Sequence, residues 1–191
     1  MSRARWMVFA CVVLAACGEK EAPNPDVDSA PIVAVQGPVA RDTAPRDTPW
    51  VVTPRGIGPV KVGMTPREAL GLTMDIAGAE VAGATCAYVK SGRVPAGVGV
   101  MASGGQVARI DVDSGAVATA EGAKIGDPEA RIHQLYAGRV KEQPHKYTNG
   151  HYLVVTPADT AYRLIFETDG RVVTAYRAGR KPEVEWVEKC G

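Results

Sequence analysis

The side chains best suited to bind an anion lie near the end of the chain. Guanidinium and ammonium groups bind carboxylates and phosphates through charge-assisted hydrogen bonds. The candidates are Arg171, Arg177, Arg180 and Lys181. They form the one ligand-binding group that we predict, for a carboxylate or phosphate on a glycan, a lipid or a protein partner. Glu183, Glu185 and Glu188 follow closely, and we expect cross-strand pairing with these glutamates to neutralise much of the charge.

The histidines and paired acids predict no further site. His145 and His151 are too far apart for one helical face and lack an evident carboxylate or thiol partner, so we expect no metal. His133 falls on an expected helix, where we expect it to face solvent. Asp111 and Asp113 would share one face of a strand, which suits calcium binding or acid–base catalysis, but such acids more often solvate an outer face.

The sequence contains no convincing phosphate-binding or nucleophile motif. Residues 97–102 fit G-x-G-x-x-A, but Ser103-Gly-Gly and another expected strand follow, where a phosphate site needs a helix. Serines lie near glycines at positions 91, 103 and 114, yet none stands in G-x-S-x-G. We therefore expect no catalytic residue and no cofactor.

Two similar helix starts would position these residues. Thr65 can cap a helix, Pro66 suits its first position and Glu68 completes a capping box. The pattern returns about 64 residues later, with Asp127 as the cap and Pro128 in the first turn. Strand-like runs follow each helix, at 85–89, 97–101 and 106–112, then at 151–155, 162–166 and 171–177.

This order predicts the fold class. Turns at Gly104-Gly105 and Asp169-Gly170 favour hairpins. A last strand over 183–188 would place Cys190 beside the core. We predict an α+β fold: two tandem repeats of a short helix followed by antiparallel strands, packed as one domain. The globular domain would span 50–191, with repeat 1 at about 56–120 and repeat 2 at about 121–191.

The beginning of the chain predicts export and anchoring. Arg3 and Arg5 precede eleven apolar residues, far fewer than the ~20 that span a bilayer, so residues 1–16 read as a signal peptide. Leu14-Ala-Ala-Cys17 resembles the lipobox of bacterial lipoproteins. That resemblance implies cleavage before Cys17 and lipidation of its thiol. An ordinary secretory signal cut after Ala-Ala stays open as the alternative.

A tether would follow the anchor. Residues 18–49 contain six prolines, and no aromatic residue lies between Cys17 and Trp50. Such a segment buries too little apolar surface to offset its chain entropy. We therefore predict a disordered, proline-rich tether over 17–49. Gly18 stands where an aspartate marks inner-membrane retention in enteric lipoproteins, which implies an outer-membrane location facing the periplasm.

The positions of the four cysteines predict a different fate for Cys11 and Cys17 than for Cys86 and Cys190. Cys11 would leave with the signal and Cys17 would be lipidated, which leaves Cys86 and Cys190. In an oxidising periplasm two remaining thiols most simply form a disulfide. A pair of reactive or metal-binding thiols is the rival interpretation, and no C-x-x-C spacing supports it.

The charge balance excludes two partner classes. Cleavage of the expected signal peptide would remove Arg3 and Arg5, so that 20 of the 22 basic residues would remain beside 21 acidic ones. A net charge near zero gives no long-range field to attract nucleic acid or an anionic membrane surface. The expected membrane contact is therefore the lipid anchor alone.

Two stretches resemble known envelope families. Gly63-Met-Thr-Pro-Arg-Glu-Ala69 is similar to the repeat shared by outer-membrane assembly lipoproteins of the SmpA/OmlA (BamE) type and by secreted beta-lactamase inhibitor proteins. Residues 107–112 with 122–126 resemble a sigma-E-regulated lipoprotein family of unknown function. These resemblances imply a tandem-repeat architecture and no active-site residues.

Three functions follow as expectations. The first is a non-enzymatic, membrane-anchored envelope lipoprotein that binds an envelope protein in assembly or maintenance. The alternative is an inhibitor of a periplasmic or secreted hydrolase, which needs clustered aromatic anchors. Nine aromatic residues follow Cys17, and we expect the core to need several, notably Phe166 and Trp186. An enzyme with an unrecognised site is the third.

Overall fold

The computed structural model describes residues 48–71, 86–89 and 91–190. The expected signal peptide, Cys17 and nearly all of the tether lie outside the described residues. The strands are β1 (Val51–Thr53), β2 (Gly56–Ile57), β3 (Val60–Lys61), β4 (Cys86–Val89), β5 (Val98–Ser103), β6 (Gln106–Val112), β7 (Ala118–Thr119), β8 (Val140–Pro144), β9 (His151–Val155), β10 (Tyr162–Thr168) and β11 (Val173–Arg180). The helices are α1 (Pro66–Leu70), α2 (Glu129–Leu135) and a 3₁₀ helix (Glu183–Glu185).

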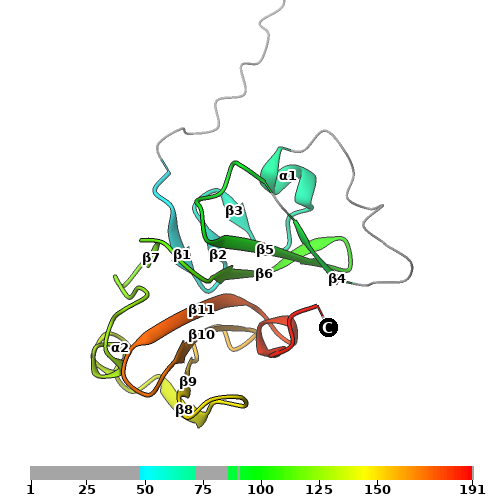
Figure 1. Cartoon of the computed structure of the whole chain (residues 1–191). Helices are drawn as coiled ribbons and strands as arrows, with labels where there is room; N and C mark the ends of the chain where they lie inside the picture. The colour runs from blue at the N-terminus through cyan, green and yellow to red at the C-terminus, as the bar shows by residue number, and fades with distance from the viewer. Residues whose placement is uncertain (1–47, 72–85, 90, 191) are drawn as a thin grey trace, which may run out of the picture. The chain divides into compact units, whose positions relative to one another are not determined.

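The described strands form two sheets (Figure 1). The larger sheet has seven strands in the order β4-β5-β6-β11-β10-β9-β8, and every neighbouring pair in it is antiparallel. The smaller sheet has four short strands in the order β3-β2-β1-β7, with β1 and β7 parallel. The chain is therefore built mainly of β structure.

Tight turns set the two central hairpins. Gly104 and Gly105 join β5 to β6 with φ angles of 59° and 76°, which is the left-handed backbone that a two-residue hairpin turn requires. Asp169 and Gly170 lie between β10 and β11, where the Asp169 side chain accepts from the Arg171 and Val172 N–H groups at 2.8 and 2.9 Å. Both predicted hairpins are confirmed.

Strand alternation divides the large sheet into two faces. One face packs against the small sheet in the main core, which includes Val52 and Ile57 from the small sheet and Ile110 and Phe166 from the large one. Successive side chains on a strand point to opposite faces, so the neighbours of these core residues on β6, β10 and β11 lie on the second face. That second face carries the candidate site.

The predicted tandem repeat is wrong. Instead of an α+β fold of two helix-plus-strand repeats, the described chain is mostly β with two sheets, and only one of its helices reaches seven residues. Strands of the two predicted units share one sheet, because β6 of the first pairs with β11 of the second. The short strands β1–β3 and β7 form a sheet that the repeat pattern does not contain. Strands of two or three residues are too short to show an alternating pattern.

The local predictions have mixed outcomes. The α1 capping box is confirmed, with Thr65 accepting from the Glu68 N–H and the Glu68 side chain accepting from Thr65. Helix α2 begins one residue later than expected, and Asp127 does not cap it but accepts from the Lys124 N–H at 2.9 Å. The predicted strand at 183–188 is wrong, because a 3₁₀ helix follows Pro182 there. None of the described helices is long and apolar enough to cross a bilayer.

Candidate functional site

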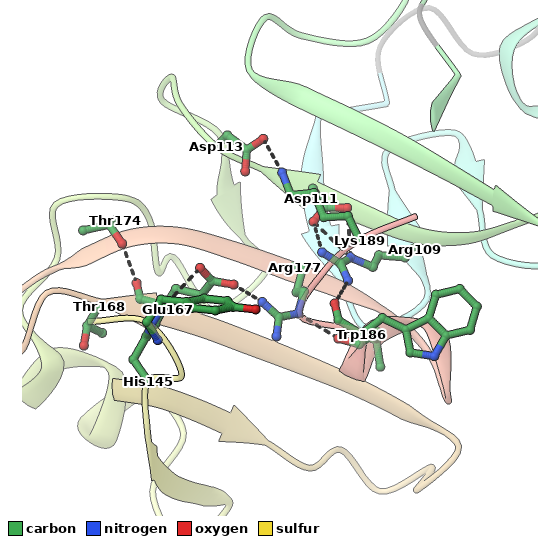
Figure 2. A network of polar contacts seen from close by, with 12 residues as sticks. Arg109, Asp111, Asp113, His145, Glu167, Thr168, Thr174, Arg177, Trp186 and Lys189 are labelled. Carbon is green, nitrogen blue, oxygen red and sulfur yellow. Dashed lines mark hydrogen bonds and ion pairs between the residues drawn. The ribbon is translucent and has the colours of Figure 1, made fainter. Parts of the chain in front are cut away.

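The second face of the large sheet carries a buried network of charged side chains (Figure 2). Arg109 and Asp111 come from β6, while Glu167 and Arg177 come from β10 and β11. Residues 183–190, here called the carboxyl-terminal strap, follow β11, and main-chain carbonyls of the strap accept hydrogen bonds from both arginines. The strap thereby covers charges that an open sheet would leave to water.

Arg109 joins the sheet to the strap. Its Nε lies 3.0 Å from each Asp111 carboxylate oxygen, and its Nη2 also donates to that carboxylate. On the strap side, Nη1 donates to the carbonyls of Trp186 at 2.6 Å and Glu183 at 3.2 Å. Arg109 is 1% exposed and Asp111 is 2% exposed. A charge buried this deeply is tolerated only when it is paired and hydrogen-bonded, and here every Arg109 nitrogen has an acceptor.

Tyr88 extends the network to β4. Its hydroxyl donates to Asp111 Oδ2 at 2.7 Å. Burial, together with the nearby Asp111 charge, raises the pKa of Tyr88 above its ordinary value. Tyr88 therefore stays protonated and acts as a donor, so it does not serve as a base.

Arg177 makes the second link to the strap. Its Nε donates to the Val184 carbonyl at 2.8 Å, and its Nη1 pairs with Glu167. Burial and the like charge of Arg109 lower the pKa of Arg177, while Glu167 opposes that shift. Glu167 also faces His145, with Nε2 of the imidazole 3.5 Å from the carboxylate.

An aromatic pair lies under Arg177. His145 stacks on Tyr152 with ring centroids 4.4 Å apart, and the Arg177 guanidinium lies 5.4 Å from the Tyr152 ring centroid. The buried Tyr152 hydroxyl has no hydrogen-bond partner among the described residues. The arrangement favours packing of the strap over proton transfer, because Tyr152 neither donates to nor accepts from any group of the network.

A disulfide and surface ion pairs hold the end of the strap. Cys86 and Cys190 form a disulfide with their Cα atoms 5.5 Å apart, as expected from the sequence. Lys189 lies 3.3 Å from Asp113, and Lys146 lies 2.6 Å from Glu188. Such exposed ion pairs stabilise little, so the main attachments are the disulfide, the buried arginines and the packing of buried Val184 against Tyr152 and Ile165.

The predicted basic group is not one surface. Arg171 is exposed before β11, whereas Arg180 and Lys181 lie at and beyond its far end. Nine residues of extended chain separate Arg171 from Arg180, roughly 30 Å. Arg177 is buried on Glu167, and Arg180 lies 3.1 Å from Glu183. Glutamates do neutralise Arg180 and Arg177, but not in the expected way. Glu183 pairs with Arg180 from three residues along the chain and not across a strand, and the partner of Arg177 is Glu167.

The histidines also lie in different environments. His133 is exposed, 3.4 Å from Glu142, as expected for a solvent-facing position. His151 Nδ1 lies 2.8 Å from Glu129, which also accepts from Thr168. The hydrogen bond to Glu129 raises the pKa of His151. Among the residues that the structure describes, no three histidines, cysteines or acids are arranged to hold a metal ion.

The paired acids do not share a site either. Asp111 is buried on Arg109, whereas Asp113 is exposed and faces Lys189. Residues 97–102 lie largely in β5, in line with the interpretation that their glycine pattern is not a phosphate loop. The one signal for the buried network is Arg109 and Asp111 at i and i+2 in an apolar strand, a pattern that we did not use to predict a site.

An open groove lies beside the network. Its volume is about 630 Å³, and it is lined mainly by the β4–β5 connection with Tyr88, Val94, Val98 and Asp113. The lining is mostly apolar, and Asp113 is its single charged side chain among the described residues. Gly97, Val98 and Gly99 of the glycine pattern at 97–102 also line this groove, but no helix follows them that could bind a phosphate.

Comparisons of the chain with protein-family models, with curated proteins and with solved structures find no match. The family resemblances therefore depend on the short stretches at 63–69, 107–112 and 122–126 alone.

Proposed function

We propose that the chain is a non-enzymatic envelope lipoprotein, anchored through Cys17, which presents its β domain to a protein partner in envelope assembly or maintenance. The observation that carries the proposal is the Cys86–Cys190 disulfide that holds the strap over buried charges. Structural disulfides persist in oxidising compartments outside the cytoplasm. This agrees with the export signal and lipobox-like stretch at the start of the chain.

The pairing of the charged groups favours binding over catalysis. Arg109, Asp111, Glu167 and Arg177 all bond to one another or to the strap. A catalytic acid or base must instead reach a substrate atom in an accessible site. The network fits a scaffold that keeps a binding surface rigid.

The distribution of aromatic residues favours a partner-binding module over a hydrolase inhibitor. Inhibitory surfaces concentrate binding energy in clustered aromatic anchors. Among the described residues, Tyr147 is the one large hydrophobic side chain that is exposed to solvent, at 60%. Phe166, by contrast, is fully buried in the core, and Trp186 is half-buried on the strap.

Crosslinking in intact cells tests the proposal. The tagged wild-type chain is compared with a Cys17→Ser variant that cannot be acylated. Capture of one stoichiometric envelope protein by the wild type, and its loss from the variant, is the expected result. Equal capture of a secreted hydrolase by both chains would favour the inhibitor, and capture of no protein would contradict the proposal.

A further inference from the structure

Strand β8 forms one edge of the seven-stranded sheet. It pairs with β9 on one side, and no described strand pairs with it on the other (Figure 1). Lys141, Glu142, Gln143 and Pro144 are all exposed, and Val140 is half-buried. The register with β9 runs through five consecutive pairs without a shift. This regular, exposed edge can therefore accept another strand.

The hydrogen bonds at both ends of β8 show which backbone groups face outward. The Arg139 carbonyl accepts from the Thr156 N–H at 3.1 Å, and the His145 N–H donates to the Gly150 carbonyl at 2.9 Å. Backbone groups of alternate residues point to opposite edges of a strand. The odd-numbered residues of β8 therefore face β9, as these two flanking residues do.

The even-numbered residues of β8 form the outer edge. Val140 and Glu142 each present an N–H and a carbonyl group to it, whereas Pro144 presents a carbonyl only. None of these groups makes a backbone hydrogen bond outside the strands among the described residues. The outer edge thus offers two donors and three acceptors to an added strand.

We propose that β8 is a strand-addition site for an extended, acidic segment of a protein partner. The inference rests on the proposed function, because it names the surface that the partner would use. Main-chain hydrogen bonds give affinity in this mode of recognition, and flanking side chains give specificity. Lys141 is exposed and forms no ion pair or hydrogen bond with any described residue, so an acidic side chain across from it completes a charge pair.

A second copy of this chain fits the edge poorly. Antiparallel self-pairing through the outward groups places Lys141 opposite Lys141 in one register and Glu142 opposite Glu142 in the next. Like charges directly opposite each other destabilise a strand pair. The Glu142 register and the next shift beyond it also require an N–H from Pro144, which proline lacks. Glu142 already faces His133 and His151, at 3.4 and 3.7 Å. Lys141 is therefore the edge charge that lacks an opposite charge among the described residues, and it favours an acidic side chain across from it.

Peptide binding with matched variants tests the site. The probe is a fluorescent heptapeptide, Thr-Val-Thr-Glu-Thr-Val-Thr, compared with the same peptide carrying a central lysine. Glu142→Pro removes an outward donor without touching the hydrogen bonds to β9, and Glu142→Ala is the control that keeps the N–H. We expect saturable binding of the glutamate peptide, a loss of at least about tenfold in affinity with Glu142→Pro, and near wild-type affinity with Glu142→Ala.

Amide exchange gives an independent readout if Glu142→Pro does not fold. In the free wild-type chain, the N–H groups of Lys141 and Gln143 should exchange slowly and those of Val140 and Glu142 rapidly. The glutamate peptide should protect the second pair. No peptide binding at about 1 mM, or binding without that protection, would overturn the proposed site.

The outcomes separate the site from the proposed function. An envelope partner captured equally by the wild type and by Glu142→Pro would sustain the binding function and overturn the β8 site. Peptide binding at β8 with no partner captured in cells would sustain the site and overturn the assigned role.

Discussion

Substitution of Asp111 should destabilise the domain far more than an average surface substitution. Asp111→Ala leaves the Arg109 guanidinium buried, with only the strap carbonyls of Glu183 and Trp186 as partners. Breaking a buried ion pair by removing one partner costs about 3–5 kcal/mol. The Tyr88 hydroxyl also loses its acceptor, so we expect a loss in the upper part of that range.

The assay is urea unfolding of residues 17–191 carrying Cys17→Ser, with the disulfide intact, followed by circular dichroism. Tyr88→Phe measures the tyrosine contribution alone. In the double variant Arg109→Met/Asp111→Ala no buried charge is left unpaired, and replacing both members of a buried pair by apolar residues is often nearly neutral. The double variant should therefore be more stable than Asp111→Ala alone, with an unchanged denaturant slope.

Two results would refute this reasoning. A loss below about 1 kcal/mol for Asp111→Ala would mean that Arg109 finds water or another acceptor. If the double variant loses as much stability as Arg109→Met and Asp111→Ala lose together, the two side chains act independently.

Three further predictions concern the strap, the pair formed by His151 and Glu129, and the first helix. Cys190→Ser opens a crosslink between residues 104 apart and should lower the free energy of unfolding by about 4–5 kcal/mol in the chain-entropy model; intact mass that does not rise by two protons on reduction would contradict the bond to Cys86. Glu129 raises the pKa of His151, so the stability that this pair adds is fully present below the unfolded histidine pKa of about 6.5 and is lost as the pH rises through the higher folded value. His151→Gln should therefore destabilise at about pH 5.5 and have little effect at about pH 9, and equal unfolding midpoints for both chains at the lower pH would contradict the pairing. Thr65→Ala removes the cap of α1 and should cost about 1 kcal/mol in urea unfolding, whereas Thr65→Ser should retain most of it.

Features set by near neighbours could be predicted from the sequence. The capping box at Thr65, the Asp169-Gly170 hairpin and the bounds of β6 and β9 all depend on residues a few positions apart. The pairing of Cys86 with Cys190 followed from compartment and elimination, and the structure places them together.

Features set by distant contacts could not be predicted. The β6–β11 pairing joins Asp111 to Arg177, far apart in the chain, and converts two expected repeats into one sheet. The segment after Pro182 alternates acidic and apolar residues like a strand, yet it turns into a 3₁₀ helix whose carbonyls accept from Arg109 and Arg177. Local alternation carries no information about such acceptors.

The candidate site shows the same division. Opposite charges at Arg109 and Asp111 are visible in the sequence, but their burial depends on the strap, which folds back from the far end of the chain. The grouping of Arg171 with Arg180 was a matter of sequence proximity, and an extended strand separates them.

Site-specific photocrosslinking in intact cells tests the central claim most directly. A photoreactive residue replaces Gln143 on the exposed edge strand, and a matched one replaces exposed Gln106 on β6, four strands away in the same sheet. A binding module that uses β8 should give one discrete envelope-protein adduct from position 143, none from position 106, and none when Glu142→Pro or Cys17→Ser is added. The same adducts from both positions, or adducts that persist in both added variants, would contradict it.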